Sequence, residues 1–316
     1  MTSPVWTCPA HGVELARAAD ALECPHGETY PVAGGVPRFV AGRTYSAAFG
    51  AQWKRYRRTQ LDSYTGTSIS RDRARRCLGA VLWSSLPGLD VLECGCGAGR
   101  FTEVLLDRGA RVTSVDLSDA VDANADNFPP DDRHRIAQAD VLELPFPPRS
   151  FDVVFCLGVV QHTPDPERTI AALYDHVKPG GTLVFDHYSR RLQWWLSTAP
   201  AFRAVLRRLP PERGLAATDA LVRLLLPLHR RARGRLATLV RRVSPVQAYY
   251  GKLPLPDDAQ VEWALLDTHD VLTDWFKHFR TREQIEATLR RLGVVDVWCI
   301  EAGNGIEARG RRPAAA

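Results

Sequence analysis

The chain has 316 residues, of which 45% are apolar and 24% charged, so it is long enough to bury a core in one large domain or two smaller ones. These proportions exclude collagen-like, intrinsically disordered and small disulfide-stapled proteins. No apolar run approaches the length of a membrane-spanning helix and no secretion signal opens the chain, so a cytoplasmic protein is expected.

The net charge of +5 is distributed unevenly. Residues 190–242 contain 13 arginines against two acidic residues, and residues 53–76 contain eight basic residues against two, so the rest of the chain is acidic. Only four of the 41 basic residues are lysines, so part of the arginine excess reflects a general preference for arginine. The remainder predicts an anionic or amphiphilic ligand, or peripheral membrane contact through residues 190–242. Nucleic acid is disfavoured because no RNA-binding or DNA-recognition motif accompanies the charge.

The first 86 residues differ in pattern from the rest of the chain. Residues 1–40 are rich in Cys, His, Pro and Gly, which predicts a small loop-and-hairpin unit. Residues 41–86 are helical in pattern, since Tyr45, Phe49, Trp53 and Tyr56 recur at helical spacing. The seven cysteines of the chain are odd in number and lack framework spacing, so reduced thiols or metal ligands are expected in place of disulfides.

Short apolar runs at 89–92, 112–115, 151–157 and 182–185 alternate with helical stretches. Buried strands that alternate with helices predict an α/β fold with a doubly wound, mostly parallel sheet. Amphipathic helices over residues 188–260 interrupt this pattern. Thr281 and Gln284 then form a capping-box pair that begins a helix, and residues 294–300 and 305–309 predict a closing hairpin.

A glycine-rich turn comes directly after the first of these strands. Gly95, Gly97 and Gly99 alternate with other residues, and Glu93 precedes them. Glycines allow a tight turn and close approach of a ligand to a helix N-terminus, although a purely structural turn is the alternative. A dinucleotide fingerprint starting at Gly95 would require glycine where Arg100 stands, and Glu93 would repel a pyrophosphate. A nicotinamide oxidoreductase is therefore disfavoured.

The segment Glu93-x-Gly95-x-Gly97-x-Gly99 resembles motif I of the class I S-adenosylmethionine-dependent methyltransferases, and further matches occur in order over residues 89–187. The resemblance implies a seven-stranded Rossmann-like sheet that binds S-adenosylmethionine. It implies that Asp116 binds both ribose hydroxyls and that Asp140, beside the Val141 N–H, binds the adenine amino group. Arg71 would pair with the methionine carboxylate, the alternative being a solvated surface arginine. The full set of cofactor-binding residues implied by the resemblance is Arg71, Glu93, Gly95, Cys96, Gly97, Gly99, Asp116, Leu117, Asp140, Val141 and Leu157.

Residues 1–40 resemble a zinc-ribbon-like leader of a bacterial subgroup of this family. The resemblance gives four candidate zinc ligands, a set that suits tetrahedral zinc: Cys8, His11, Cys24 and His26. A single residue separates the last two, fewer than the usual two to four. The alternative is a degenerate ribbon without metal, and either form would have a structural role.

Methyl transfer is an in-line displacement, so positioning dominates and a base is needed only where the acceptor must lose a proton. His162 lies in the loop that the resemblance places beside the methyl group, and it is the first candidate base. Its alternative role is to shape that loop. Asp267 and His269 form a second candidate catalytic cluster that the fold could bring over the pocket, the alternative being a loop of solvated acids.

The sequence therefore predicts a cytoplasmic S-adenosylmethionine-dependent methyltransferase acting on oxygen or nitrogen of a small-molecule acceptor. Two alternatives remain: an RNA or protein methyltransferase that docks through its Arg-rich segments, and a cofactor-binding scaffold without activity. Neither the acceptor nor the oligomeric state can be inferred from the sequence. The expected parts are a leader (1–40), helices covering the cofactor (41–86), a cofactor-binding core (87–187), an Arg-rich helical lid (188–260) and the end of the core (261–316).

Overall fold

The computed structural model describes residues 4–42, 44–190, 197–303 and 305–315. The chain forms two compact units: Met1–Gly42, Arg71–Arg190 and Phe276–Ala316 make the first, and Arg43–Ser70 with Arg191–Trp275 make the second. This division differs from the predicted one, because residues 43–70 and 261–275 group with the predicted lid. Residues 191–196 of that lid lie outside the described residues. No described helix has the length and apolar character needed to cross a membrane.

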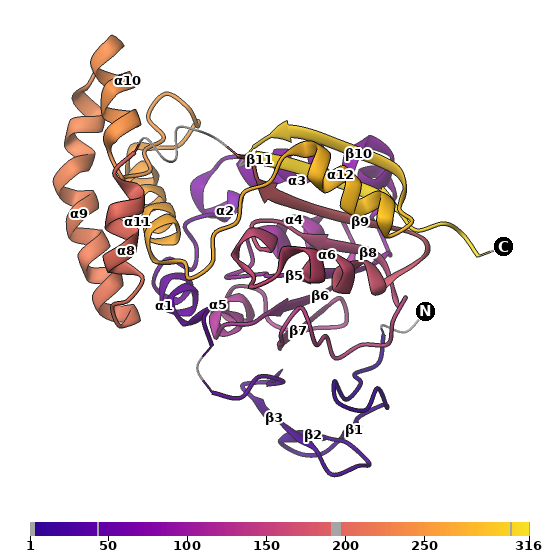
Figure 1. Cartoon of the computed structure of the whole chain (residues 1–316). Coiled ribbons are helices and arrows are strands. Elements are labelled where there is room, and N and C mark those ends of the chain that lie inside the picture. Colours follow the sequence, from indigo (N-terminus) through magenta and orange to yellow (C-terminus); the bar gives the residue numbers. More distant parts are fainter. Residues whose placement is uncertain (1–3, 43, 191–196, 304, 316) are drawn as a thin grey trace. The chain divides into compact units, whose positions relative to one another are not determined.

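The first unit is built on seven strands: β5 (Asp90–Cys94), β6 (Arg111–Asp116), β7 (His134–Gln138), β8 (Phe151–Cys156), β9 (Val177–Tyr188), β10 (Val295–Ala302) and β11 (Gly305–Arg311). They form one sheet in the order β10-β11-β9-β8-β5-β6-β7 (Figure 1). Strands β5 to β9 are parallel, whereas β10 and β11 pair antiparallel at one edge. From β5 the strand order continues through β6 and β7 on one side, and from β8 through β9 on the other, so the switch point of the sheet lies between β5 and β8. Doubly wound sheets bind ligands at this point.

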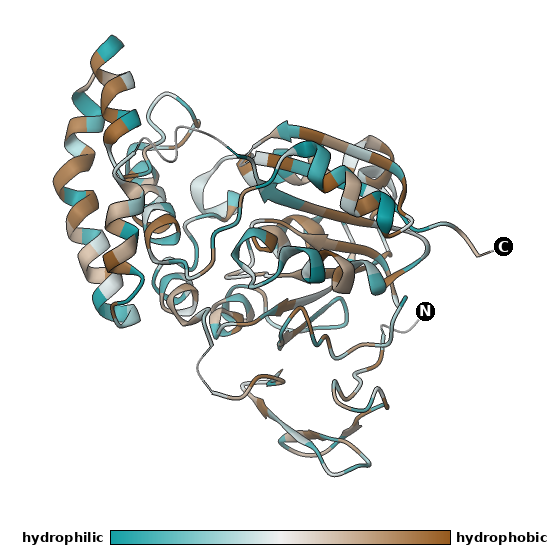
Figure 2. Cartoon of the chain, viewed as in Figure 1, coloured by the Kyte–Doolittle hydropathy of each residue, from teal (hydrophilic) through white to brown (hydrophobic). Residues whose placement is uncertain are grey.

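Both faces of this sheet are buried. Val91, Val153 and Phe155 belong to one apolar cluster, and the alternate residues Leu92 and Val154 belong to another (Figure 2). Alternation of side chains between faces, with both faces covered, gives the near-continuous apolar runs seen in the sequence. The helices of this unit are α3 (Ile69–Ser85, beginning at the border of the second unit), α4 (Arg100–Asp107), α5 (Ala120–Asn127), the 3₁₀ turn η1 (Val160–His162), α6 (Pro166–Asp175) and α12 (Arg282–Arg291).

The predicted fold class, an α/β doubly wound and mostly parallel seven-stranded sheet, is confirmed. The capping box at Thr281 and Gln284 begins α12, and the closing hairpin is β10–β11. Strand β7 was not predicted, because its residues His134–Gln138 are mostly polar or charged and give no apolar run.

The leader contains four short antiparallel strands: β1 (Ala16–Arg17), β2 (Ala21–Glu23), β3 (Thr29–Ala33) and β4 (Val36–Pro37). It packs on the large sheet, where the Trp6 ring lies 5.0 Å from Phe146 between centroids and 5.7 Å from Phe39. The Phe39 N–H donates to the carbonyl of Gln138 in β7, and Arg38 forms an ion pair with Asp122. The leader is therefore an integral part of the first unit.

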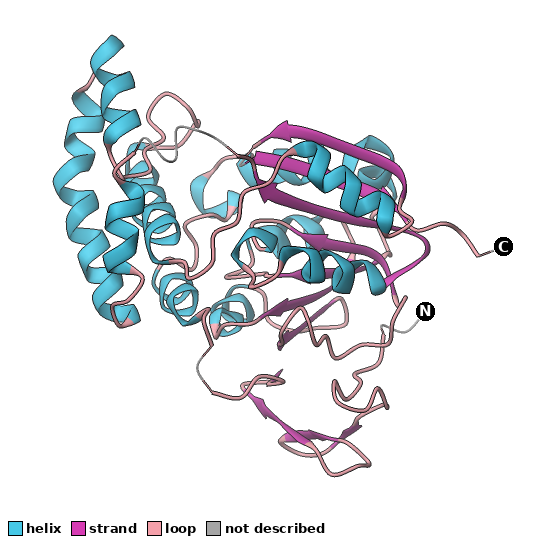
Figure 3. Ribbon diagram, viewed as in Figure 1, coloured by secondary structure: helices cyan, strands magenta, loops and turns pink. Residues whose placement is uncertain are grey.

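The second unit is helical throughout its described residues (Figure 3). Its helices are α1 (Ala47–Arg55), α2 (Asp62–Thr65), α8 (Ala199–Leu206), α9 (Pro211–Arg231), α10 (Gly234–Val243) and α11 (Asp257–Thr273). Val222 and Leu226 of α9 pack with Leu265 and Leu266 of α11 in its core. Because this contact joins α11 to α9, residues 261–273 belong to the helical unit and not to the end of the sheet domain.

Candidate functional site

The glycine-rich turn lies directly after β5. Gly95, Gly97 and Gly99 all have positive φ, of 72°, 51° and 99°, which L-residues with a side chain rarely adopt. A Cβ on Gly95 would lie 2.1 Å from Cγ2 of Val159 in the loop after β8, so the two loops of the switch point are in close contact. Helix α4 begins after Gly99, and its N-terminus is suited to a negatively charged group.

Glu93 is buried at the end of β5, and its side chain is held by two hydroxyl groups. Thr102 Oγ1 donates to Glu93 Oε2 over 2.5 Å, and Ser114 Oγ donates to the same oxygen over 2.9 Å. Burial raises the pKa of Glu93 from 4.5 to about 7 despite these hydrogen bonds. The carboxyl group is therefore poised to become fully ionised if a cation lies beside it.

Asp116 ends β6 and is positioned by backbone N–H groups. Its Oδ2 accepts from Gly97 N over 2.9 Å, while Oδ1 accepts from the Ser118 backbone and hydroxyl over 2.8 and 2.7 Å. The Gly97 contact ties this carboxylate to the glycine turn. Leu117 is the next residue, and its carbonyl accepts from Gln138 over 3.1 Å. Asp116 is thus fixed where the predicted ribose-binding acid would be required.

Asp140 lies just after β7, the next strand along the sheet, and its Oδ1 accepts from Leu142 N over 2.9 Å. Val141, between them, is buried, as is Leu157 after β8. The predicted side chains Glu93, Asp116, Asp140 and Leu157 therefore lie at or just beyond the ends of four neighbouring strands, at the same edge of the sheet. Cys94 and Cys96 are buried, and burial raises the pKa of both thiols, so they pack as small apolar side chains.

Arg71 lies on the surface and forms an ion pair of 2.8 Å with Asp107. Two residues on, Arg73 is buried and pairs with Asp186, whose other oxygen accepts from Gly158 N over 2.6 Å. Arg73 therefore connects α3 to the loop after β8. It was not predicted from the sequence, because only the packing of α3 distinguishes its side of the helix from that of Arg71.

His162 ends η1 in the loop after β8, and both of its ring nitrogens are engaged. Nδ1 lies 3.2 Å from the carbonyl of Phe276, and Nε2 lies 3.2 Å from the hydroxyl of Tyr188. A carbonyl only accepts, so Nδ1 carries the proton and Nε2 offers its lone pair. The Lys277 ammonium lies 4.7 Å from the centre of the Tyr188 ring. Tyr188 and Lys277 are therefore neighbours of the candidate base that were not predicted from the sequence.

The neighbouring Gln161 is fully buried (0% exposed), and neither atom of its side-chain amide has a hydrogen-bond partner among the described residues. Its backbone carbonyl accepts from His278 N over 2.9 Å. A buried amide without partners costs about 1–3 kcal/mol, which marks it as a candidate contact for a bound molecule. The signal in the sequence was a polar residue shortly after the apolar run of β8.

Asp267 and His269 lie in helix α11 of the second unit, so the polar loop considered for these positions is replaced by a helix. His269 is buried, its Nδ1 lies 2.6 Å from Gln52 Oε1, and burial lowers its pKa to about 4. Asp267 accepts hydrogen bonds from Gln60 and Tyr249. Both side chains therefore contribute to the hydrogen bonding inside the helical unit, because the apolar residues around them bury this part of α11.

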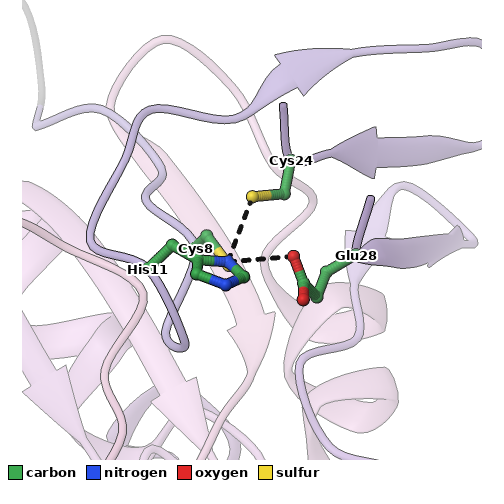
Figure 4. Close-up of side chains that lie close together, drawn as sticks. All are labelled: Cys8, His11, Cys24 and Glu28. Atoms are coloured by element: carbon green, nitrogen blue, oxygen red, sulfur yellow. Dashed lines mark hydrogen bonds and ion pairs between the residues drawn. The ribbon is translucent and has the colours of Figure 1, made fainter. Parts of the chain in front are cut away.

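In the leader, the predicted ligands Cys8, His11 and Cys24 lie together, but the fourth member of the cluster is Glu28 (Figure 4). Each contributes one atom, and these atoms all lie within 4.8 Å of one another. The ring of His26 instead lies against the ring of His11, with centroids 4.7 Å apart. His26 was predicted from the family resemblance, although its spacing from Cys24 is shorter than usual.

Residues 92–185 match a family model described as "Methyltransferase domain". The prediction of a class I S-adenosylmethionine-dependent methyltransferase domain is confirmed by this match and by the sheet topology described above.

Curated relatives of this methyltransferase domain include proteins named "Ubiquinone biosynthesis O-methyltransferase". The protein of Pseudomonas entomophila (strain L48) is 37% identical over 130 residues, which cover 40% of this chain and 56% of the relative. That of Coxiella burnetii (strain Dugway 5J108-111) is 34% identical over 128 residues, covering 40% and 55%. The chain thus spans about half the length of the curated relatives it matches. A solved structure of a putative S-adenosylmethionine-dependent methyltransferase from Methanococcus maripaludis has a TM-score of 0.48 and 12% identity, covering 88% of this chain and 98% of that one.

Proposed function

We propose that this protein transfers a methyl group from S-adenosylmethionine to an oxygen or nitrogen of a small-molecule acceptor. The observation that carries the proposal is the turn after β5. Its three glycines have positive φ at the switch point of the sheet, and Gly97 N donates to the carboxylate of Asp116 at the end of β6. This combination suits a ligand with ribose hydroxyls that approaches the main chain closely.

The side chains at the strand ends match the functional groups of S-adenosylmethionine, which supplies an electrophilic methyl group on a sulfonium cation. Glu93 offers a carboxyl group to the ammonium, Asp116 accepts from the ribose hydroxyls, and Asp140 accepts from the adenine amine. A Cβ on Gly95 or Gly99 would lie under 3.0 Å from a neighbouring side chain, so the turn requires glycine at both positions. Arg71 is set aside as a ligand in favour of its surface ion pair with Asp107.

Oxygen is the favoured acceptor atom, because the curated relatives are named as O-methyltransferases. A hydroxyl acceptor must lose its proton during transfer, and His162 Nε2 offers a lone pair for it. The Tyr188 hydroxyl, 3.2 Å from Nε2, is placed either to relay that proton or to yield its position to the acceptor hydroxyl. Asp267 and His269 are not needed in this scheme.

Binding of the methyl donor is tested by calorimetry with purified full-length protein. We expect S-adenosylmethionine to bind, and Asp116→Ala to weaken binding at least tenfold because each hydrogen bond to a charged acceptor contributes about 1.5–3 kcal/mol. Asp132→Ala, an exposed acidic residue of the same unit, serves as the control and should leave the affinity unchanged. Failure of the unmodified protein to bind S-adenosylmethionine would refute the proposed function.

Methyl transfer is tested by measuring S-adenosylhomocysteine formation with hydroxylated aromatic acceptors. His162→Asn should lower kcat by about 10²–10⁴-fold while S-adenosylmethionine affinity stays within twofold, because the base acts only in the chemical step. An unchanged kcat would restrict His162 to shaping the loop. Binding without turnover of any small molecule, RNA or peptide would favour the scaffold alternative.

A further inference from the structure

Two tight turns of the leader face each other across a cluster of potential metal ligands. In the first, His11 N and Gly12 N both donate to the Cys8 carbonyl, over 3.3 and 2.7 Å. In the second, between β2 and β3, Gly27 N donates to the Cys24 carbonyl over 2.9 Å, and Cys24 N donates to the Glu28 carbonyl. Each turn thus presents its first and last side chains on the same side (Figure 4).

Two separations within the cluster match the edges of a metal-centred tetrahedron. His11 Nδ1 lies 3.5 Å from the sulfur of Cys8 and 3.5 Å from that of Cys24. Zinc bonds of about 2.3 Å to sulfur and 2.0–2.1 Å to nitrogen, at tetrahedral angles, require such an edge to be about 3.5 Å. The distance from His11 Nδ1 to Glu28 Oε2 is 2.9 Å.

Hydrogen bonding among these side chains alone leaves the cluster unsatisfied. His11 Nδ1 has at most one proton, but two sulfurs and one carboxylate oxygen surround it. Glu28 Oε2 is also buried, and the His11 Nδ1 that lies 2.9 Å from it is shared with the two sulfurs. A central cation would satisfy all four groups together.

We infer that Cys8, His11, Cys24 and Glu28 hold one zinc ion, with Glu28 in the position that the family resemblance gives to His26. Two thiolates and an imidazole form a donor set that suits zinc, and a carboxylate completes it. Four protein ligands leave no open position, so the ion has a structural role. His26 supports the site from outside, since its backbone N–H donates to Cys24 Sγ over 3.4 Å and its ring packs against His11.

The ion would join the two turns of a leader whose strands have only two to five residues. Its own apolar cluster contains just four buried residues, two of them the cysteines. Such a small core stabilises little, so metal binding would supply much of the folding free energy of this segment. The site does not depend on the proposed methyl transfer.

The test is the metal content of full-length protein purified from cells grown with zinc. We expect one zinc per chain, and cobalt substitution should give the visible bands of a tetrahedral thiolate site. In competition with a chelator, Glu28→Gln should weaken zinc binding at least tenfold and by more than His26→Ala, which removes the ring contact with His11 but keeps the backbone N–H that donates to Cys24. Cys24→Ser should lose the metal altogether.

Two results would overturn the assignment. A chain that binds no zinc and shows no cobalt–thiolate bands would exclude the metal. If His26→Ala lost the metal and Glu28→Gln retained it, histidine would be the fourth ligand. Binding of S-adenosylmethionine, measured alongside, reports whether each variant is folded, so loss of zinc is distinguished from loss of the whole structure.

A second inference comes from the helical unit, where apolar side chains gather on the outside of successive helices. Leu224 is 75% exposed and Leu228 48%, one turn apart on α9. On α10, Leu236, Leu239 and Val243 are all exposed and only Val240 is buried. These five exposed residues, the outer face, lie outside the core of their unit.

The sequence around the outer face is strongly basic, although Arg230 of α9 pairs with Asp257 over 3.0 Å. From residue 220 to residue 256 the sequence contains seven arginines and one lysine but no aspartate or glutamate. Four of the arginines, Arg233, Arg235, Arg241 and Arg242, belong to α10 or cap it. A second copy of this face would bring arginine against arginine, so a symmetric dimer through it is disfavoured. An anionic lipid surface complements both the charge and the apolar side chains.

We propose that the outer face binds the surface of an anionic lipid bilayer. The leucines would enter the boundary between headgroups and acyl chains, and each arginine near the surface contributes about 1 kcal/mol. The helices would lie along the surface, in keeping with the absence of a described helix able to cross it. This binding is independent of the proposed methyl transfer, although it would bring the enzyme to amphiphilic acceptors.

Sedimentation with vesicles tests the proposal. We expect binding to phosphatidylcholine vesicles that contain phosphatidylglycerol, weakened by salt, and little binding to phosphatidylcholine alone. The double variant Leu236→Ser/Leu239→Ser should reduce binding at least tenfold. Val81→Ser, on α3 of the other unit and 84% exposed, should have no effect.

Equal binding to both kinds of vesicle, or to neither, would overturn the proposal. Concentration-dependent dimerisation that the double variant abolishes would identify the outer face as a contact between copies of this chain. S-adenosylmethionine affinity of each variant is measured as a folding control, so failure here is distinguishable from failure of the proposed activity.

Discussion

Replacing Gly95 with alanine tests whether the turn after β5 is held by contact with the loop after β8. Gly95 has φ of 72°, and a Cβ there would lie 2.1 Å from Cγ2 and 3.1 Å from Cβ of Val159. Val159 directly precedes the buried Val160 and η1, so the clash would displace the loop that leads to His162. We therefore expect Gly95→Ala to lower both stability and cofactor affinity.

The expected loss of stability in Gly95→Ala has two parts. A left-handed backbone costs an alanine about 1–2 kcal/mol, and overpacking in a buried contact costs typically about 1–3 kcal/mol more. Gly95→Ala should thus lower the free energy of unfolding by about 2–5 kcal/mol. Gly88 has a similar φ of 78°, but no atom lies within 4 Å of its added Cβ, so Gly88→Ala should cost only the backbone part.

Urea denaturation of the two variants measures the difference, and calorimetry with S-adenosylmethionine gives the effect on binding. The double variant Gly95→Ala/Val159→Ala removes the clashing methyl groups and should recover the contact part of the loss, less the cost of the cavity left by the valine side chain. If Gly95→Ala and Gly88→Ala were equally stable and both bound the cofactor normally, the close contact between the two loops would be refuted.

Three further predictions concern buried polar groups. Burial raises the pKa of Glu93 from 4.5 to about 7, so the folded protein binds this proton more tightly than the unfolded chain. The free energy of unfolding should therefore fall by up to about 3 kcal/mol as the pH rises from about 4.5 to about 7. Glu93→Gln should flatten that slope in urea denaturation across this pH range; an unchanged slope would assign it to other groups. Gln161→Leu should raise the melting temperature, because it removes a buried amide without partners. The same variant should raise either the KM for the acceptor or the Kd of S-adenosylmethionine. An unchanged KM and Kd would exclude Gln161 from the site. Arg73→Ala should cost about 3–5 kcal/mol because it leaves Asp186 buried without its partner, whereas Arg71→Ala, which breaks an exposed pair, should cost less than about 1 kcal/mol; equal losses of stability in urea denaturation would contradict this difference.

The sheet and its ligand-binding edge could be predicted because they depend on local patterns. Apolar runs locate β5, β6, β8 and β9, and the glycines identify the turn whose backbone requires them. The capping residues of α12 were equally local. In contrast, β7 is short and mostly polar, so its pairing with β6 depends on the neighbouring strand and leaves little trace in the sequence.

Contacts between distant segments could not be inferred from local patterns in the sequence. Whether His26 or Glu28 belongs to the cluster with Cys8 depends on how the turn between β2 and β3 directs successive side chains. Whether Arg71 or Arg73 is buried depends on which side of α3 packs against the protein. The helical surroundings of His269 result from α11 packing on α9, a helix that is distant in sequence. In each case the partners of the residue are set by tertiary packing.

Glu93 connects the sequence motif to the physical chemistry of the turn. The motif assigns it to an ammonium group, whereas in the structure its carboxyl group accepts from Thr102 and Ser114. The two roles are compatible, because both hydroxyls donate to Oε2 and a pKa of about 7 leaves the group partly protonated. A cation beside it lowers that pKa and completes ionisation. The buried carboxyl group is thus tolerated without a ligand, because it is partly protonated, and it becomes fully ionised only when an ammonium group binds beside it. The burial that lowers stability at neutral pH therefore also strengthens the attraction for a cationic ligand.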